Sequence, residues 1–410
     1  MVTMTFAEFI LQHEADDPVR LLLSRGKYPD IDLDLAVTTL EVRRRLKSKV
    51  PEWYAVPSLV YPSRLSGEQC SSSETARYKA MVCRSSLVPA KERLRIADLT
   101  GGMGVDAWAF AQVAEEVLYN EMQEGLVRAA ELNFRELGAC NIRFRNCRVE
   151  PGMVREVLDG FQPDVIFLDP ARRAGDGRKV FLIEECQPDV LGLLQELFET
   201  GRFVMLKLSP MADITMACKR LGTHVKEIHV VAAGGECKEL LFLLDRDWEG
   251  PLATFIVENG AVMEIPGQAG NDDAGIGFGV PEAGDCLFEP GKALAKAGAF
   301  RLPCSRFGLT KLGNHTHLYM GEAVPEGLKP FGKWFEVLEV LPLNNRTMKE
   351  AGKRWPQAEV TARNVPMTSD QLRRKLGCAS GGDIHLFGVR ADAAEAGNYL
   401  IVTKKRYGSD

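Results

Sequence analysis

Short apolar runs alternate with amphipathic segments from about residue 91 to residue 245. This alternation is typical of βαβ units, in which each parallel strand is followed by a helix that packs on the sheet. The predicted strands occupy residues 94–99, 117–120, 142–146, 164–168 and 202–208. The predicted helices between them occupy residues 105–114, 123–137 and 181–198. The pattern therefore predicts an α/β domain with five parallel strands.

Two further apolar runs follow, at 224–232 and 238–245, and only the five residues 233–237 separate them. A connection this short cannot hold a crossover helix, so the two runs must form an antiparallel hairpin. A nicotinamide-binding Rossmann domain keeps its sixth strand parallel, and the hairpin therefore argues against that fold.

The rest of the chain has a different texture. Residues 1–90 show helical spacing of Leu, Ile and Val, at 6–13, 18–24 and 33–47, and predict a helical N-terminal region. A glycine-rich stretch between Pro266 and Pro281 marks a loop or domain boundary. The last part of the chain is predicted to form a small α+β module. Its predicted strands occupy residues 334–341, 359–362, 385–389 and 399–402, and its predicted helix occupies residues 372–376. Thr368 and Gln371 form a capping box for that helix, and Gly377 ends it.

Length and composition agree with several globular domains. The chain has 410 residues, too many for one ordinary core, and no apolar run reaches the roughly 20 residues of a membrane helix. The N-terminus does not have the pattern of a signal peptide. Ten cysteines without a C-x-x-C pair indicate reduced thiols in a cytoplasmic protein, and no set of ligands predicts a metal site.

The charge is distributed unevenly. The net charge is −5, with 20 Lys/Arg against 27 Asp/Glu in residues 91–249, and 13 against 9 in residues 330–410. A chain with a basic end can bind RNA locally although its net charge is negative. A solvated tail with a few extra lysines would have the same charge, so charge alone leaves both interpretations open.

The strongest chemical motif lies where the first predicted strand ends. Asp98 is followed by a glycine-rich turn and then by a helix that contains Asp106; the turn residues expected to contact a ligand are Thr100, Gly101, Gly102 and Gly104. Glycine lets a backbone approach a ligand closely, and a helix N-terminus presents free N–H groups to a carboxylate. An acid at the strand end suits S-adenosylmethionine better than a pyrophosphate. The spacing alone also loosely fits a dinucleotide turn, or a tight turn without a ligand.

The next two strands end in further polar residues. Glu121 follows the second strand, where its carboxylate can accept hydrogen bonds from two ribose hydroxyls. Asn146 and Cys147 follow the third strand, where contacts with an adenine edge are expected.

Strands four and five end in candidate catalytic residues. The fourth strand leads into Asp169, Pro170, Ala171, Arg172 and Arg173, at the edge of the sheet where reacting atoms lie in Rossmann-like folds. Asp169 can accept a hydrogen bond from an amine, Pro170 stiffens the turn, and the arginines can hold phosphate or stack on a base. Lys207, near the end of the fifth strand, either points into the site or pairs with an acid.

Several stretches together resemble a known family. They are Tyr61-Pro62-Ser63-Arg64-Leu65-Ser66-Gly67-Glu68-Gln69-Cys70-Ser71-Ser72, Thr75-Ala76-Arg77-Tyr78-Lys79, Asp98-Leu99-Thr100-Gly101-Gly102, Asp169-Pro170-Ala171-Arg172-Arg173, Lys207-Leu208-Ser209-Pro210, Arg363-Asn364-Val365-Pro366 and Leu372-Arg373-Arg374-Lys375-Leu376. Residues 57–245 resemble class I S-adenosylmethionine-dependent methyltransferases. The whole chain is similar to a bacterial group of them with a C-terminal THUMP-like domain.

The resemblance implies a Rossmann-like sheet of seven strands, the last two forming the hairpin, with cofactor contacts at Asp98, Gly101, Gly102, Gly104 and Glu121. It also implies four parts: a helical region at 1–90, a methyltransferase domain at 91–265, a small ferredoxin-like domain at 281–329 and a THUMP-like domain at 330–410. THUMP-type domains suggest a structured RNA partner, although a fold does not determine a function.

Two departures narrow the chemistry. Ala171 and Arg172 stand where amino-methylating enzymes often have a second proline and an aromatic residue. Pyrimidine C5-methylating enzymes need a nucleophilic cysteine near strand five, where this chain has Ser209. The leading hypothesis is direct methyl transfer to a base nitrogen of ribosomal or transfer RNA. A methyltransferase that acts on a protein or small molecule, and a non-catalytic cofactor- or RNA-binding protein, are the alternatives.

Overall fold

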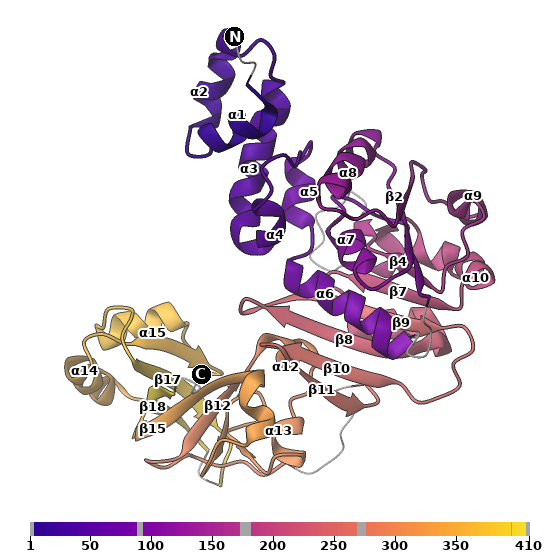
Figure 1. Cartoon of the computed structure of the whole chain (residues 1–410). Helices are drawn as coiled ribbons and strands as arrows, with labels where there is room; N and C mark the ends of the chain where they lie inside the picture. The colour runs from indigo at the N-terminus through magenta and orange to yellow at the C-terminus, as the bar shows by residue number, and fades with distance from the viewer. Residues whose placement is uncertain (1–3, 88–92, 173–181, 269–275, 395, 407–410) are drawn as a thin grey trace. The chain divides into compact units, whose positions relative to one another are not determined.

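The computed structural model describes residues 4–87, 93–172, 182–268, 276–394 and 396–406. The chain forms two compact units (Figure 1). The first unit comprises residues 1–228 and 239–250, and the second comprises residues 229–238 and 251–410. The finer division of the chain into four domains stays a prediction.

The N-terminal region is helical, as predicted. Its helices are α1 (Phe6–Gln12), α2 (Pro18–Leu23), α3 (Leu33–Lys49), α4 (Pro51–Tyr54), α5 (Arg64–Gln69) and α6 (Ser73–Val82), with short turns η1 (Arg25–Lys27) and η2 (Cys83–Leu87). Phe9, Ile10 and Leu21 pack with the apolar face of α3 in a small buried core. Side-chain caps begin all of these α-helices except α4; for example, the Asp32 carboxylate accepts from the Leu35 N–H at the start of α3.

Seven strands of a nine-stranded sheet have the order β8-β9-β7-β4-β1-β2-β3. These strands are β1 (Arg95–Asp98), β2 (Glu116–Asn120), β3 (Ile142–Arg145), β4 (Val165–Leu168), β7 (Phe203–Leu208), β8 (Val225–Ala233) and β9 (Glu236–Asp245). The five strands from β3 to β7 in this order are parallel, whereas β9 runs antiparallel to β7. This arrangement confirms the predicted fold class, including the antiparallel hairpin.

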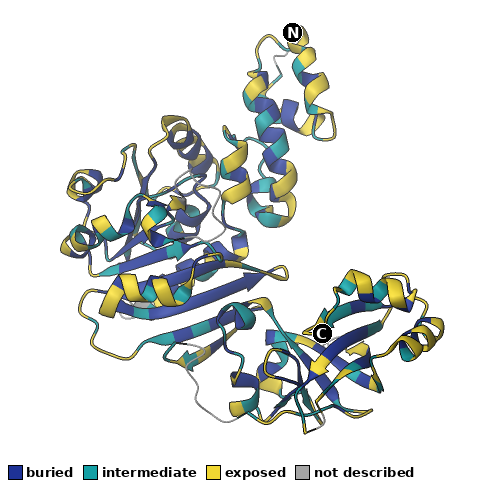
Figure 2. Cartoon of the chain, turned by 180° about the vertical axis from the view of Figure 1, so that it is seen from behind, coloured by how far each residue is buried: buried dark blue, intermediate teal, exposed yellow. Residues whose placement is uncertain are grey.

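Helices pack on this sheet, whose central strands are buried (Figure 2). They are α7 (Val105–Ala111), α8 (Glu124–Glu136), α9 (Val154–Leu158), α10 (Val190–Thr200) and α11 (Ile214–Leu221), with turns η3 (Ile183–Glu185) and η4 (Gly222–His224). The helix predicted at 181–198 is wrong at its start. Pro188 has no N–H to donate and Asp189 caps the Gly192 N–H, so the helix begins at Val190.

A short ladder precedes that helix. The backbone of β5 (Ala171–Arg172) pairs antiparallel with β6 (Cys186–Gln187). This pairing brings residues that follow the fourth parallel strand beside residues that precede α10.

The second unit contains two groups of strands. The hairpin β10 (Ala253–Glu258) and β11 (Ala261–Pro266) lies beside β8 in the strand order. A separate sheet has the order β13-β14-β12-β15-β18-β17-β16. Its strands are β12 (Cys286–Pro290), β13 (Thr310–Lys311), β14 (Tyr319–Gly321), β15 (Gly332–Pro342), β16 (Glu359–Arg363), β17 (Ile384–Ala391) and β18 (Gly397–Arg406).

Short helices accompany that sheet. They are α12 (Lys292–Lys296), α13 (Leu302–Ser305), η5 (Glu326–Phe331), α14 (Asn345–Arg354) and α15 (Ser369–Leu376). The capping box of Thr368 with Gln371 and the left-handed Gly377 after α15 are confirmed. The sequence pattern missed α14, because this mostly polar helix buries little more than Met348, Ala351 and Gly352.

Among the described residues, we find no helix that combines the length and the apolar character needed to cross a bilayer.

Gly352 provides a test of the packing between α14 and α15. A Cβ at Gly352 would lie 1.6 Å from the Leu376 carbonyl oxygen, so Gly352→Ala forces the two helices apart. We expect the free energy of unfolding to fall by about 2 kcal/mol or more, as for other overpacked sites. Urea denaturation of the full chain measures the change.

Gly125 in α8 is the matched control, because no atom lies within 4 Å of the position that a Cβ would take there. At this position alanine should stabilise the helix by up to about 1 kcal/mol. Equal stability of Gly352→Ala and the wild-type protein would contradict the close packing.

Candidate functional site

The turn between β1 and α7 is shaped by its glycines. The Gly101 N–H donates to the Asn120 carbonyl at 2.7 Å, and a Cβ at Gly101 would lie 2.2 Å from the Tyr119 ring. Gly104 has a φ of 94°, and a Cβ there would lie 2.6 Å from the Phe134 ring. These two glycines are therefore required by packing against aromatic rings. Gly102 differs, since only one atom lies within 4 Å of its Cβ position.

A pocket opens at this turn. Its wall includes eight of the residues predicted from the sequence to form the site, namely Thr100, Gly101, Gly102, Gly104, Asp106, Glu121, Cys147 and Asp169. Asp98, Asn146, Pro170 and Lys207 were also predicted but are not part of the wall, and the backbone of Arg172 lies in β5. The side chain of Arg172 and the whole of Arg173 fall outside the described residues.

Glu121 is held rigidly at the end of β2. Its Oε2 accepts from the Gly102 N–H at 3.0 Å, and its Oε1 accepts from the Gln123 N–H at 2.9 Å. Each carboxylate oxygen keeps further acceptor capacity, which a pair of hydroxyl groups could use. The Asn146 side-chain amide donates to the Glu121 carbonyl oxygen at 2.7 Å, and this bond fixes the backbone at Glu121.

Cys147, which belongs to the pocket wall, is held in place through its backbone. The Cys147 N–H donates to the Asn120 Oδ1 at 3.0 Å, and the Asn120 amide donates to the Cys147 carbonyl at 3.0 Å. Both bonds join the ends of β2 and β3, and neither of them involves the Cys147 side chain.

Asp98 lies beneath the turn and is almost wholly buried, with 1% of its surface exposed. Its Oδ1 accepts from the Thr100 N–H at 3.0 Å, whereas its Oδ2 has no hydrogen-bond partner among the described residues. Burial, followed by the nearby carboxylate of Asp106, raises the pKa of Asp98 well above its usual value. The Thr100 hydroxyl accepts from the Asp169 N–H at 2.7 Å and ties the ends of β1 and β4 together.

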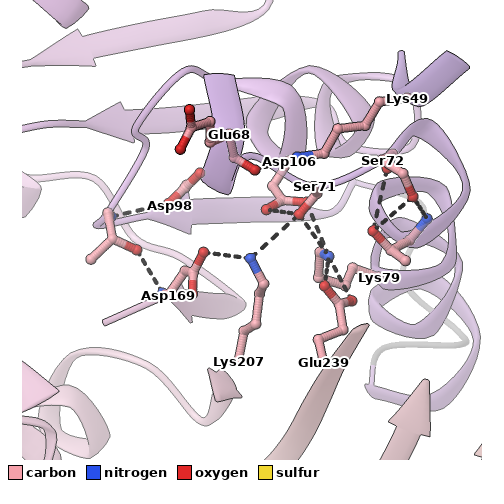
Figure 3. Close-up of polar contacts among 12 residues, drawn as sticks. Lys49, Glu68, Ser71, Ser72, Lys79, Asp98, Asp106, Asp169, Lys207 and Glu239 are labelled. Carbon is pink, nitrogen blue, oxygen red and sulfur yellow. Dashed lines mark hydrogen bonds and ion pairs between the residues drawn. The ribbon is translucent and has the colours of Figure 1, made fainter. Parts of the chain in front are cut away.

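Asp169 and Lys207 form an ion pair at the ends of β4 and β7 (Figure 3). The Lys207 Nζ lies 2.5 Å from the Asp169 Oδ2. Burial by itself would lower the pKa of Lys207, but the carboxylates of Asp169, Asp106 and Glu239 outweigh it, and the pKa is raised. Lys207 is therefore a cation that pairs with an acid, which decides between the two alternatives that the sequence left open.

The N-terminal region also contributes to the pocket wall, which the sequence pattern did not predict. Ser66, Gln69, Cys70 and Ser71, which lie in and just after α5, form part of the pocket wall. The Ser71 hydroxyl donates to the Asp106 Oδ2 at 2.8 Å. The sequence signal for these residues was the polar stretch 61–72, which was noted for its resemblance to a family but not assigned to the site.

Several known proteins and family models are similar to this chain. Residues 332–405 match the family model for a THUMP domain-like domain, and residues 287–327 match the model for a ferredoxin-like domain. The crystal structure of a methyltransferase candidate from Porphyromonas gingivalis W83 is 30% identical, with a TM-score of 0.83 over 99% of this chain and 98% of that one.

Two curated relatives extend the comparison. An uncharacterized S-adenosylmethionine-dependent methyltransferase of Mycobacterium tuberculosis is 28% identical over 355 residues, which are 86% of this chain and 91% of the relative. The 23S rRNA (uracil(1939)-C(5))-methyltransferase RlmD of Edwardsiella ictaluri is 31% identical over 131 residues, which are 28% of this chain and 30% of the relative.

The raised pKa of Asp98 predicts a pH-dependent stability. A carboxyl group whose native pKa lies above its unfolded value stabilises the fold fully below that unfolded value, about 3.9, and this stabilisation is lost as the pH rises through the native pKa. Asp98→Asn keeps the shape and cannot ionise. Between those two pKa values, we expect its free energy of unfolding, relative to the wild-type protein, to increase by about 1.4 kcal/mol per pH unit. Urea denaturation between pH 4 and pH 8 measures this difference, and a difference that does not change with pH would exclude the buried carboxyl as its source.

Proposed function

Because this chain belongs to the class I S-adenosylmethionine-dependent methyltransferases with a C-terminal THUMP-like domain, we propose that it transfers a methyl group to a base nitrogen in structured RNA, ribosomal or transfer RNA. The observation that carries the proposal is the pocket at the ends of β1, β2 and β4, which presents a glycine turn, a rigid carboxylate and an ion-paired aspartate to one space. Each of these residues has its own role in the proposed reaction.

The residues of the pocket fit S-adenosylmethionine. Glu121 would accept hydrogen bonds from the ribose hydroxyls, because both of its oxygens are held in place by backbone N–H groups. Gly102 leaves open space at its Cβ position, so the ligand could approach the backbone closely. The Asp98 Oδ2 has no hydrogen-bond partner among the described residues, and a cationic ligand in the pocket would favour the ionised form of this buried carboxyl group. Thr100, Gly101, Gly104, Asp106 and Cys147 would complete the wall.

When bound, the cofactor supplies the methyl group: its carbon–sulfur bond breaks, the electron pair stays on sulfur, and the lone pair of the substrate nitrogen forms the new bond. Asp169 would orient that nitrogen, since its Oδ2 pairs with Lys207 and its Oδ1 remains to accept a substrate N–H. Buried Pro170 keeps the turn after β4 rigid. Lys207 cannot take up the proton that leaves the methylated nitrogen, because its raised pKa keeps it protonated. That proton would pass to water at the partly exposed Asp169 carboxylate. The role of Lys207 would be to hold Asp169 in place, and orientation rather than acid–base chemistry would supply most of the rate.

The choice of a nitrogen rests on the end of β7. The relative from E. ictaluri is a C5-methyltransferase by name, and such enzymes need a nucleophilic cysteine there. This chain has Ser209 instead, and its hydroxyl accepts from the Met211 N–H at 3.2 Å. Direct transfer without a covalent enzyme–base bond fits these residues better.

RNA as the substrate is supported by three observations. The THUMP-like domain at 332–405 carries the basic end of the chain. Arg374 and Lys375 of α15 are exposed and present positive charge to solvent. Partial relatives include an RNA methyltransferase of Enterococcus faecalis, which is 33% identical over 94 residues. Arg172, three residues after Asp169 in the sequence, would add a phosphate or base contact.

The direct test of the proposal is nucleoside mass spectrometry of ribosomal and transfer RNA from cells with and without the gene. We expect one methylated nucleoside to disappear with the gene and to return with the wild-type copy. An unchanged set of RNA modifications would contradict RNA as the substrate, and methyl incorporation into the protein or small-molecule fraction would replace it.

Asp169 and Glu121 should separate catalysis from cofactor binding. Asp169→Ala, and the isosteric Asp169→Asn, should reduce methyl transfer at least about 100-fold while S-adenosylhomocysteine affinity stays within a few-fold, because orientation and not binding is lost. Glu121→Ala should weaken that affinity about tenfold or more, because two charge-assisted hydrogen bonds are lost. Isothermal titration calorimetry and transfer of a tritiated methyl group to RNA from the deletion strain measure both. Full transfer by both Asp169 variants would end the catalytic assignment.

The basic face of α15 should carry part of the RNA affinity. The double variant Arg374→Glu/Lys375→Glu should weaken binding and lower the slope of log affinity against log salt by about 0.7 to 0.9 for each phosphate that is no longer neutralised. The matched control is Arg20→Glu/Lys27→Glu, which makes the same charge change at exposed residues of the N-terminal region. Filter binding from 50 to 200 mM salt measures both slopes. Equal slopes for the two double variants would remove α15 from the interface.

A further inference from the structure

Below the pocket, five charged side chains form one connected network (Figure 3). The Lys79 Nζ lies 2.7 and 2.9 Å from the two carboxylate oxygens of Glu239 and 3.2 Å from the Asp106 Oδ1. The second lysine, Lys207, is paired with Asp169. Three carboxylates thus face two ammonium groups, and one net negative charge remains when all five are ionised.

The Ser71 hydroxyl joins the two halves of this network. It accepts from the Lys79 Nζ at 3.1 Å, it lies 3.5 Å from the Lys207 Nζ, and it donates to Asp106 at 2.8 Å. Lys79 has no exposed surface, and α6 contributes it from the N-terminal region. A lysine without solvent is stable as a cation only if carboxylates surround it.

The network reaches the pocket wall through three residues, Asp106, Asp169 and Ser71. Lys79 and Glu239 are not part of that wall, so any effect they have on a ligand must pass through charge or through their neighbours. Burial weakens the dielectric screening of these charges. A charge on Lys79 or Glu239 can therefore change the electrostatic potential at a ligand several ångströms away.

We propose that Lys79, Ser71 and Glu239 are positioning residues of the methyl-transfer site, and that their network with Asp106, Asp169 and Lys207 sets a negative potential in the pocket that favours the cationic cofactor over its neutral product. The inference rests on the proposed function, in which a sulfonium ion enters this pocket. It assigns the N-terminal region to the active site, through α6 and the segment that leads to it. Transfer of the methyl group removes the positive charge from sulfur. The negative potential therefore attracts the cationic cofactor but not its neutral product.

The network shifts the pKa values of Asp106 and Glu239 in opposite directions. Burial raises the pKa of Asp106, but Lys79, Lys207 and the Ser71 hydroxyl outweigh it, and its pKa is lowered. Burial dominates at Glu239 and raises its pKa despite Lys79 and Lys207. Glu239 is not part of the pocket wall, so a change of its charge leaves the residues of that wall in place.

The test compares two ligands that differ in charge. Sinefungin carries an ammonium group where S-adenosylmethionine carries its sulfonium, whereas S-adenosylhomocysteine is neutral there. Calorimetry on the full chain gives the ratio of the two affinities. In Glu239→Gln the buried Lys79 keeps its charge through Asp106, so the network becomes more positive, and the preference for sinefungin should fall about tenfold. Asp106→Asn, which removes a different carboxylate from Lys79, should shift the ratio in the same direction.

A compensating variant separates charge from structure. Lys79→Met/Glu239→Gln removes one charge of each sign and should restore the wild-type ratio. Glu52→Gln is the control, because Glu52 pairs with Arg77 of the same helix α6 but outside the network, and its ratio should not change. Melting curves establish that each variant is folded before titration.

A merely structural role would weaken both ligands by the same factor and leave the ratio unchanged. That result in both single variants, or failure of the double variant to restore the ratio, would overturn this inference and leave the proposed function standing. A folded wild-type protein that binds neither ligand would instead contradict the proposed function, and this inference with it.

Discussion

The common edge of the parallel strands is the constraint on which the site depends. Hydrogen bonding in parallel register places the ends of β2, β1, β4 and β7 side by side. Residues that are far apart in the chain, such as Glu121, Asp169 and Lys207, are thereby brought to one place. Each of them is held by short-range bonds once it is there, for example Glu121 by two backbone N–H groups. The pocket is thus a consequence of strand order rather than of any one loop.

The buried charges below this edge need each other. An isolated ammonium or carboxylate in a protein interior is strongly unfavourable, and breaking one buried pair destabilises a protein by about 3 to 5 kcal/mol. Lys79 avoids this penalty by contacting Glu239, Asp106 and the Ser71 hydroxyl. The same contacts join α6, the start of α7 and strand β9. Packing and electrostatics of the site are therefore coupled within the first unit.

The glycines of the turn after β1 show that one motif serves two purposes. Gly101 and Gly104 are required because the Tyr119 and Phe134 rings occupy the space of a side chain. Gly102 borders the pocket without such a neighbour, and its N–H orients Glu121. A glycine pattern by itself does not distinguish these purposes, which explains why it loosely fits more than one class of ligand.

Much of the fold followed from local pattern. Apolar runs of strand length, the five-residue connection before β9 and the capping box of α15 were sufficient to predict the parallel sheet, its hairpin and the helix, because each depends on neighbouring residues. The acids at the strand ends were found for the same reason. The polar helix α14 and the start of α10 at Val190 were missed or misplaced, since a weak apolar face and a cap after Pro188 leave little periodic signal.

The tertiary structure alone decided the partners of the buried charges. Lys79 and Glu239 are 160 residues apart, and Ser71 and Lys207 are 136 apart, so no spacing in the sequence indicates that they meet. The pairing of Lys207 with Asp169, and the place of Ser66 and Ser71 in the pocket wall, arise only when the N-terminal helices pack on the finished sheet. Sequence determines which side chains a strand end or a turn presents, whereas long-range packing determines which of them form ion pairs with one another.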